Sequence, residues 1–247
     1  MILPKPQDAV HRGQIFRLLI EIIDNKFLSS SLVFKGGTCA TILGFLDRFS
    51  VDLDFDLLPL SNVSEIKSEF TKIFVHLGLT IKDESIRVVQ YKLSYKALPN
   101  QRNTLKLDAV GVVSEDDVTE VKLLPDIQRY MRCQTIETMF SHKLVALKDR
   151  YKKHNRIAGR DVYDIHSFFL NGYSYNATTV ERRVGKSIKD YFTELKEFLQ
   201  TVVTDEIITQ DLNMLLGYEE FNQVRKSLRV ELISMLNDEI KRLGING

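Results

Sequence analysis

Residues 34–57, FKGGTCATILGFLDRFSVDLDFDL, decide how the first half of the chain folds. A short apolar stretch is broken by Gly36-Gly37, and a helical pattern resumes from Thr38 to Asp47. From Ser50 to Pro59, polar and apolar residues alternate, as is typical of a strand. The segment therefore predicts a strand, a glycine turn, a short helix and a second strand.

The second predicted strand carries three acids on one face, because side chains two residues apart in a strand point the same way. These are Asp52, Asp54 and Asp56. Neighbouring carboxylates repel one another, and a bound divalent cation removes the conflict. Oxygen ligands of this kind are those that magnesium prefers. The alternative is a solvated strand face next to Arg48 and Lys35.

A further acid lies in a separate alternating segment, residues 105–109, where Asp108 shares a face with Lys106. If this segment is an adjacent strand, Asp108 completes a metal site begun by Asp52 and Asp54. Alternatively, Asp108 is a polar residue on an exposed sheet face.

The glycine turn Gly36-Gly37-Thr38 joins a strand to a helix. Glycine allows another group to approach the backbone closely, and the free N–H groups at a helix start bind phosphate. The hydroxyl of Thr38 can add a hydrogen bond. The alternative is an ordinary tight turn in which Thr38 caps the helix.

The rest of the chain divides into an α/β half and a helical half. We expect helices at 7–27 and from Asn62, strands between 79 and 113, and helices after Pro125 with interruptions near Asn171-Gly172 and Leu216-Gly217. The predicted fold class is α+β. A mixed sheet with flanking helices occupies residues 1–125, and an all-helical domain occupies residues 126–247.

Composition excludes several classes of protein. Hydrophobic residues make up 44% and charged residues 27%, which argues against disorder and against a membrane protein. The 34 basic and 33 acidic residues give a net charge of +1, so there is no overall attraction to nucleic acid. With two cysteines and no signal-peptide pattern, we expect a cytoplasmic protein.

Two residues of the helical half stand out. Lys143 is in register with an apolar stripe and must therefore either extend its ammonium group to solvent or meet an anion, which is a triphosphate or a partner carboxylate such as Asp161. Asp161 itself lies near the buried face of its helix, and Asp164 is spaced for an ion pair with Arg160. The basic run from Arg150 to Arg160 either contacts RNA backbone or is a solvated face.

These motifs together resemble the AbiEii/AbiGii toxin nucleotidyltransferases of the DNA polymerase β-like superfamily. The family pattern is a glycine pair with Thr or Ser, a helix, and then R-x-S-x-D-x-D, which is matched here by Gly36-Gly37-Thr38 and residues 48–54. Residues 137–150 resemble the family's lysine-bearing helix, and residues 160–165 resemble its R-D-x-Y-D helix. The basic insertion at 152–156 departs from the pattern.

The resemblance implies a role for each matched residue. It implies that Mg²⁺ or Mn²⁺ binds Asp52, Asp54 and Asp108. The implied nucleotide-binding residues are Gly36, Gly37, Thr38, Arg48, Ser50 and Lys143. The implied catalytic residues are Asp52, Asp54, Asp108, Lys143 and Asp161.

It also implies the reaction: transfer of a nucleoside monophosphate from an NTP to an RNA, such as tRNA, or to a protein. The expected setting is the toxin of a bacterial toxin–antitoxin or phage-defence pair, with a cognate antitoxin as partner and no membrane. The alternative is an inactive or phosphodiester-hydrolysing relative that acts as a nucleotide- or RNA-binding module.

Overall fold

The structure, a computed structural model, describes residues 3–99 and 101–245. The chain forms two compact units, Met1–Thr135 and Ile136–Gly247. The division lies later than the expected boundary at 125, because residues after Pro125 form one more strand, β7 (Arg129–Gln134), which pairs with β1 and β6. The expectation that helices follow Pro125 directly was wrong for this segment.

The first unit is built on a seven-stranded mixed sheet of order β3-β4-β5-β2-β1-β7-β6. Its pairs β1–β7 and β2–β5 are parallel, and the others are antiparallel. The strands are β1 (Leu32–Lys35), β2 (Asp52–Leu57), β3 (Thr80–Glu84), β4 (Val89–Ser94), β5 (Thr104–Val112), β6 (Thr119–Leu124) and β7. The helices are α1 (Asp8–Asp24), α2 (Lys26–Ser31), α3 (Gly36–Ile42) and α4 (Val63–Leu77).

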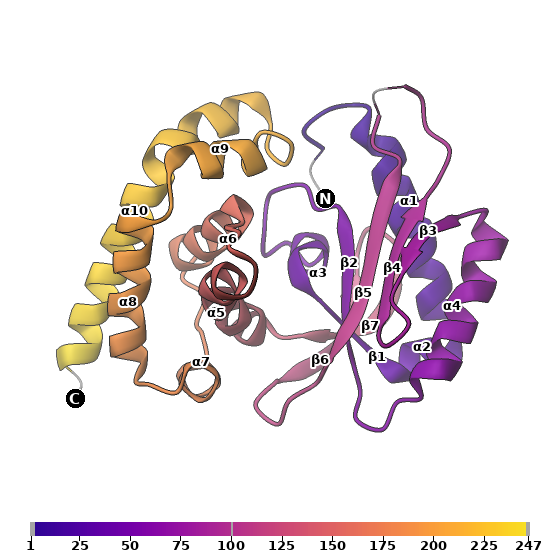
Figure 1. Cartoon of the computed structure of the whole chain (residues 1–247), viewed down its shortest axis with the longest axis horizontal. Coiled ribbons are helices and arrows are strands. Elements are labelled where there is room, and N and C mark those ends of the chain that lie inside the picture. The colour runs from indigo at the N-terminus through magenta and orange to yellow at the C-terminus, as the bar shows by residue number, and fades with distance from the viewer. Residues whose placement is uncertain (1–2, 100, 246–247) are drawn as a thin grey trace. The chain divides into compact units, whose positions relative to one another are not determined.

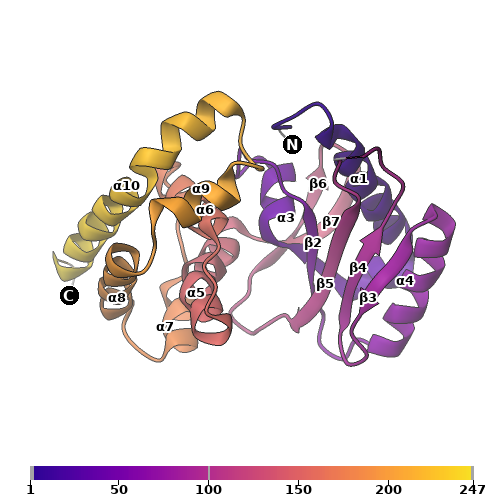
Figure 2. The same cartoon turned by 45° about the horizontal axis from the view of Figure 1, so that its top comes forward.

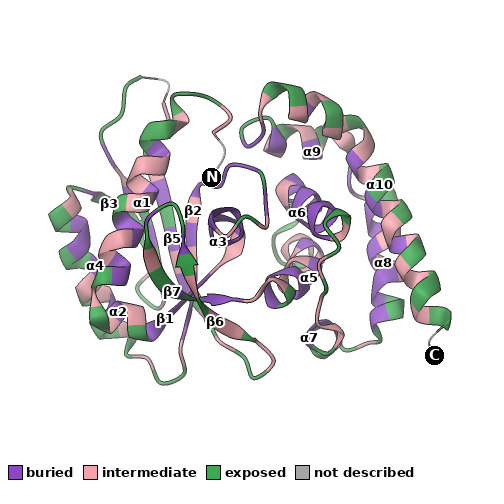
Figure 3. Ribbon diagram, turned by 180° about the vertical axis from the view of Figure 1, so that it is seen from behind, coloured by how far each residue is buried: buried purple, intermediate pink, exposed green. Residues whose placement is uncertain are grey.

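Helices α1, α2 and α4 cover one face of this sheet, and α3 lies on the other face (Figures 1 and 2). Strand alternation determines what each face receives. Leu53 and Phe55 of β2 are fully buried in the core, where Phe70 and Phe74 of α4 pack against Tyr91 of β4. Figure 3 shows buried residues on the sides of α1 and α4 that face the sheet. The polar residues of β2 are therefore left on the side of α3.

The second unit is helical throughout its described residues. Its helices are α5 (Ile136–His154), α6 (Gly159–Leu170), α7 (Ala177–Val184), α8 (Ile188–Thr201), α9 (Asp205–Leu212) and α10 (Tyr218–Ile245). Helix α6 packs against α5, α9 and α10. The aromatic core of this unit is formed by the rings of Phe140, Phe168, Phe169 and Phe192. The α+β class predicted from the sequence is confirmed.

Local sequence signals account for several helix ends. Asn62 caps α4 by accepting a hydrogen bond from the Glu65 N–H, and the predicted interruptions fall after α6 and before α10. The single helix expected at 7–27 is instead broken at Asn25, whose side chain caps α2. In residues 3–99 and 101–245, every helix is too short or too polar to span a lipid bilayer.

Candidate functional site

The acids of β2 and β5 come together through strand register. Asp54 lies directly opposite Asp108 across the parallel pair β2–β5, and Asp52 lies opposite Lys106. Strands in a sheet are about 4.8 Å apart, so paired side chains on one face are neighbours. The structure therefore places Asp52, Asp54 and Asp108 in one neighbourhood on the face that the core leaves free.

Asp108 is the most perturbed of these acids. Its Oδ1 atom is buried without a hydrogen-bond partner among the described residues. Burial raises the pKa of its carboxyl group, the negative charge of Asp52 adds to this, and Gln90 and Lys106 act in the opposite direction. A buried carboxylate oxygen without a partner is unfavourable unless a cation or proton joins it.

The chemistry of these donors fits a magnesium or manganese ion. Among the described residues, no group of three or more His, Cys, Asp and Glu side chains is arranged as a finished metal cage. Magnesium sites of this kind use one or two carboxylates and are completed by waters and substrate phosphates. Asp52, Asp54 and the unpartnered oxygen of Asp108 would supply the protein ligands.

Asp56, the third acid of the β2 series, has a different environment. Lys35 Nζ donates to its Oδ1 at 2.5 Å, and Gln134 Nε2 donates to its Oδ2 at 2.9 Å. A β-bulge after Phe55 shifts its pairing with β5. Both of its oxygens thus have partners within the fold, which explains why Asp56 contributes structure rather than a free ligand.

Both glycines of the turn are packed closely against the motif that follows them. Gly36 has φ +77°, and a Cβ there would lie 2.6 Å from Asp54 Oδ2. A Cβ on Gly37 would lie 2.6 Å from Arg48 Nη2 and 3.1 Å from Ser50 Oγ. Glycine is therefore required at Gly36 for its backbone conformation and at both positions for close contact with the R-x-S-x-D-x-D segment.

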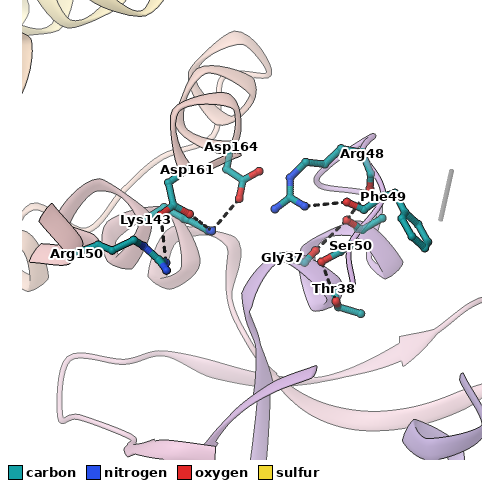
Figure 4. Close-up of polar contacts among 10 residues, drawn as sticks. Gly37, Thr38, Arg48, Phe49, Ser50, Lys143, Arg150, Asp161 and Asp164 are labelled. Carbon is teal, nitrogen blue, oxygen red and sulfur yellow. Dashed lines mark hydrogen bonds and ion pairs between the residues drawn. The ribbon is translucent and has the colours of Figure 1, made fainter. Parts of the chain in front are cut away.

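Hydrogen bonds join the same two segments (Figure 4). Thr38 and Ser50 share a bond of 2.8 Å between their hydroxyl oxygens, and the Thr38 hydroxyl also contacts the carbonyl of Asp52. Arg48 is buried and donates from Nη1 to the Phe49 carbonyl at 2.9 Å. Since Thr38 is fully buried, its hydroxyl holds the turn against β2.

Within the second unit, Lys143 of α5 lies between two carboxylates of α6 (Figure 4). Its Nζ is 2.7 Å from Asp161 Oδ1 and 2.8 Å from Asp164 Oδ2, and both acids are 0% exposed. Arg150 Nη2 adds an ion-pair contact of 3.3 Å to Asp161 Oδ2. Burial opposes ionisation of Asp161, but the charges of Lys143 and Arg150 outweigh it and lower the pKa of Asp161.

The structure thus pairs Lys143 with Asp161, the partner carboxylate that the sequence left open, and adds Asp164. Sequence reasoning paired Asp164 with Arg160 on helical spacing, and missed its contact with Lys143. The available signal was the spacing of Asp161 and Asp164, which puts two acids on one side of a helix. Two carboxylates buried on one side of a helix require a cation, which another helix can supply.

The candidate residues therefore form two clusters, each described within its own unit. The cluster of the first unit comprises Gly36, Gly37, Thr38, Arg48, Ser50, Asp52, Asp54 and Asp108. The cluster of the second unit comprises Lys143, Arg150, Asp161 and Asp164. In the basic run, Lys152, Lys153 and Arg156 are exposed at and beyond the end of α5.

Comparison with solved structures shows the same fold elsewhere. A candidate nucleotidyltransferase from H. pylori superposes with a TM-score of 0.61 at 23% sequence identity, covering 98% of this chain and 99% of that one. JHP933 from Helicobacter pylori gives a TM-score of 0.56 at 22% identity, covering 99% and 96%. No curated protein matches the chain in sequence.

The family comparison covers most of the chain. Residues 17–229 match the model of the nucleotidyl transferase AbiEii toxin of type IV toxin–antitoxin systems. This range contains both clusters, and it confirms the family resemblance drawn from the motifs. The chain therefore belongs to the AbiEii toxin family, and it is a nucleotidyltransferase.

Proposed function

We propose that the chain transfers a nucleoside monophosphate from an NTP to an acceptor hydroxyl, with Mg²⁺ or Mn²⁺ held by Asp52, Asp54 and Asp108. The observation that carries this proposal is the register of Asp54 with Asp108, next to a glycine turn in which Gly36 packs on Asp54. When bound, a divalent cation supplies positive charge to the phosphoryl oxygens.

The glycine turn is suited to hold the triphosphate. The N–H groups at the start of α3 are free of helical partners, and the glycines leave room for phosphate oxygens near the backbone. Thr38, Ser50 and Arg48 keep the turn in place through the contacts described above. In this proposal they position the turn, and the backbone binds the phosphates.

Asp108 is the best-placed residue to take the proton of the acceptor hydroxyl. Its Oδ1 has no hydrogen-bond partner among the described residues, and in this proposal it serves either as the third ligand to the cation or as the base that takes this proton. The acceptor oxygen then forms a bond to the α-phosphorus while the bond from that phosphorus to the bridging oxygen breaks. Pyrophosphate leaves with the electron pair of that bond.

Lys143 and Asp161 of the second unit are proposed as further catalytic residues. Asp161 and Asp164 fix the position of the Lys143 ammonium group, and a fixed cation stabilises charge that develops during phosphoryl transfer. The proposed acceptor is an RNA such as tRNA, and the proposed setting is the cytoplasm, with a cognate antitoxin as partner.

The test uses the parent, Asp52→Asn and Asp54→Asn, with an NTP labelled at the α-phosphate and total bacterial RNA and protein as acceptors. We expect the parent to retain label on an acceptor and release pyrophosphate, and both variants to lose transfer by about 100-fold or more, as when a preorganised electrostatic group is removed. Glu65→Gln, an exposed acid of α4, is the matched control and should transfer normally.

Melting curves test whether both variants remain folded, as we expect, so that a loss of transfer can be assigned to the site. An NTP with Mg²⁺ should raise the Tm of the parent more than Mg²⁺ alone, and the variants should lose that difference. A folded variant lacking both acids that still transfers label would contradict the site. Cleavage of RNA without label retention would instead favour the phosphodiester-hydrolysing alternative.

A further inference from the structure

Strands β3 and β6 form the two edges of the sheet in the first unit. An edge strand has backbone N–H and C=O groups that no neighbouring strand receives, and proteins usually protect such an edge with charges or a β-bulge. Strand β3 has both: residues 82–84 are charged and exposed, and its register with β4 shifts between Ile81 and Asp83. By contrast, the register of β6 with β7 is regular along the whole strand.

One face of the β6–β7 hairpin is apolar and exposed. Val121 and Leu123 of β6 share this face with Tyr130 of β7, which lies directly opposite Leu123. Their exposed fractions are 59%, 38% and 67%. Within the described residues, β6 has extensive contacts with β7 alone. Single exposed apolar residues are ordinary, but adjacent ones beside an open strand edge indicate a contact surface.

The backbone of β6 presents hydrogen-bonding groups along this edge. The N–H of Thr135 donates to the carbonyl of Val118 at 3.0 Å, in line with the register of the hairpin. In an antiparallel pair, the hydrogen-bonded positions alternate along each strand. The even-numbered residues of β6 therefore direct their backbone groups to β7. The odd-numbered ones, Thr119, Val121 and Leu123, direct theirs away from it, so each offers an N–H and a C=O to a further strand.

The sequence of β6 is complementary to itself in the antiparallel direction. If the Val121 residues of two copies lie opposite each other, Glu120 of each copy faces Lys122 of the other, and Thr119 faces Leu123. The outward backbone groups then fall at hydrogen-bonded positions, and the charge pairs fall at the positions between, where cross-strand side chains lie closest. Within one chain, Lys122 Nζ is 3.1 Å from Glu120 Oε2. Two copies thus bring together four charges of alternating sign.

We propose that two copies of this chain form a symmetric dimer through β6, with the two β6 strands antiparallel and the two sheets joined into one. Thr119, Val121 and Leu123 of each copy exchange backbone hydrogen bonds with the other copy, and the apolar face continues across the junction. A two-fold axis between the two Val121 residues uses the same patch on both copies, so the assembly closes at the dimer. The residues of this contact lie outside both clusters of candidate site residues.

Charge reversal tests the pairing, with the mass followed by sedimentation equilibrium over a dilution series. We expect the parent to show twice the mass of the chain, falling on dilution. Glu120→Lys and Lys122→Glu each place like charges at both cross-strand pairs, so each variant should dimerise on the order of tenfold more weakly. Mixed in equal amounts, the two variants restore both opposite-charge pairs in a heterodimer and should associate like the parent. Lys82→Glu, on the exposed edge β3, is the matched control and should dimerise normally.

Val121→Pro tests the backbone contact separately. The N–H of Val121 is directed away from β7, so proline there keeps the bonds of the hairpin and removes a donor to the second copy. We expect this variant to be monomeric and to melt close to the Tm of the parent. If it does not fold, the mixture of the two charge variants decides the question.

Three results overturn the proposal. The first is a parent that stays monomeric at every concentration, including the case in which β6 receives a strand of a different protein. The second is a mixture of the two charge variants that is no more dimeric than either variant alone. The third is a dimer that survives Val121→Pro and both charge reversals, because its contact then lies elsewhere on the chain.

Discussion

Replacing Lys143 with methionine tests the buried cluster of the second unit. In the parent, one ammonium group faces two carboxylates that are 0% exposed, and Arg150 contacts only one of them. The variant removes the ammonium group from both buried acids and keeps the Arg150 contact of 3.3 Å to Asp161. Removing one partner of a buried ion pair costs about 3–5 kcal/mol, so we expect a loss of that size.

The assay is thermal unfolding followed by circular dichroism. At roughly 2–4 °C per kcal/mol for a chain of this size, the expected fall in Tm is roughly 6–20 °C. Adding Asp164→Asn to the variant removes one of the two buried charges that Lys143 contacts in the parent, so the double variant should recover part of the loss. The non-additivity of the two changes measures the coupling between the two side chains.

The pH dependence of stability is an independent test of the same ion pairs. In the parent, the lowered pKa of Asp161 contributes stability that is present above its unfolded value and is lost as the pH falls through the folded one. Without Lys143, the effect of burial on Asp161 is opposed by Arg150 alone and its pKa should rise, so the variant should regain stability relative to the parent as the pH falls. The reasoning from the buried ion pairs is refuted if Lys143→Met is as stable as the parent at pH 7, or if its deficit does not shrink in acid.

Two further predictions concern the first unit. Gly36→Ala should lower stability by about 1–3 kcal/mol, because alanine is strained at φ +77° and its Cβ would meet Asp54 Oδ2 at 2.6 Å; an unchanged Tm would contradict this. Burial lowers the pKa of His11 from 6.5 to about 4. The unfolded chain therefore binds a proton at His11 below pH 6.5 while the folded protein keeps it neutral down to about pH 4, which lowers stability by roughly 2–3 kcal/mol between pH 7 and pH 4.5. Urea titrations at both pH values should show a shallower acid loss for His11→Gln, and an equal loss in both proteins would show that His11 is not responsible.

The candidate site shows which features can be predicted from the local sequence pattern. Strand alternation in β2 predicts that Asp52 and Asp54 share a face, and the break at Gly36-Gly37 predicts the turn, because both depend on residues a few positions apart. The same reasoning treats Asp56 as equivalent to its neighbours. Only the structure shows that the carboxylate of Asp56 accepts hydrogen bonds from Lys35 and Gln134, which lie on two other strands.

Strand β7 was missed for a related reason. Its alternation is visible afterwards, with Tyr130 and Arg132 exposed and Met131 and Cys133 buried. The segment is only six residues long, and short runs of this kind do not distinguish a strand from a loop or helix end until a partner strand is known. Its pairing with β1 decides that it belongs to the first unit.

The sequence by itself determined the motif residues, the faces that they share along one element and the family that they indicate, because periodicity and spacing are local properties of the chain. The tertiary structure decided the partners: Asp54 opposite Asp108, and Lys143 between two acids of another helix. Strand order, register and helix packing depend on contacts between distant residues, and these are determined by burial of the whole core rather than by any one segment.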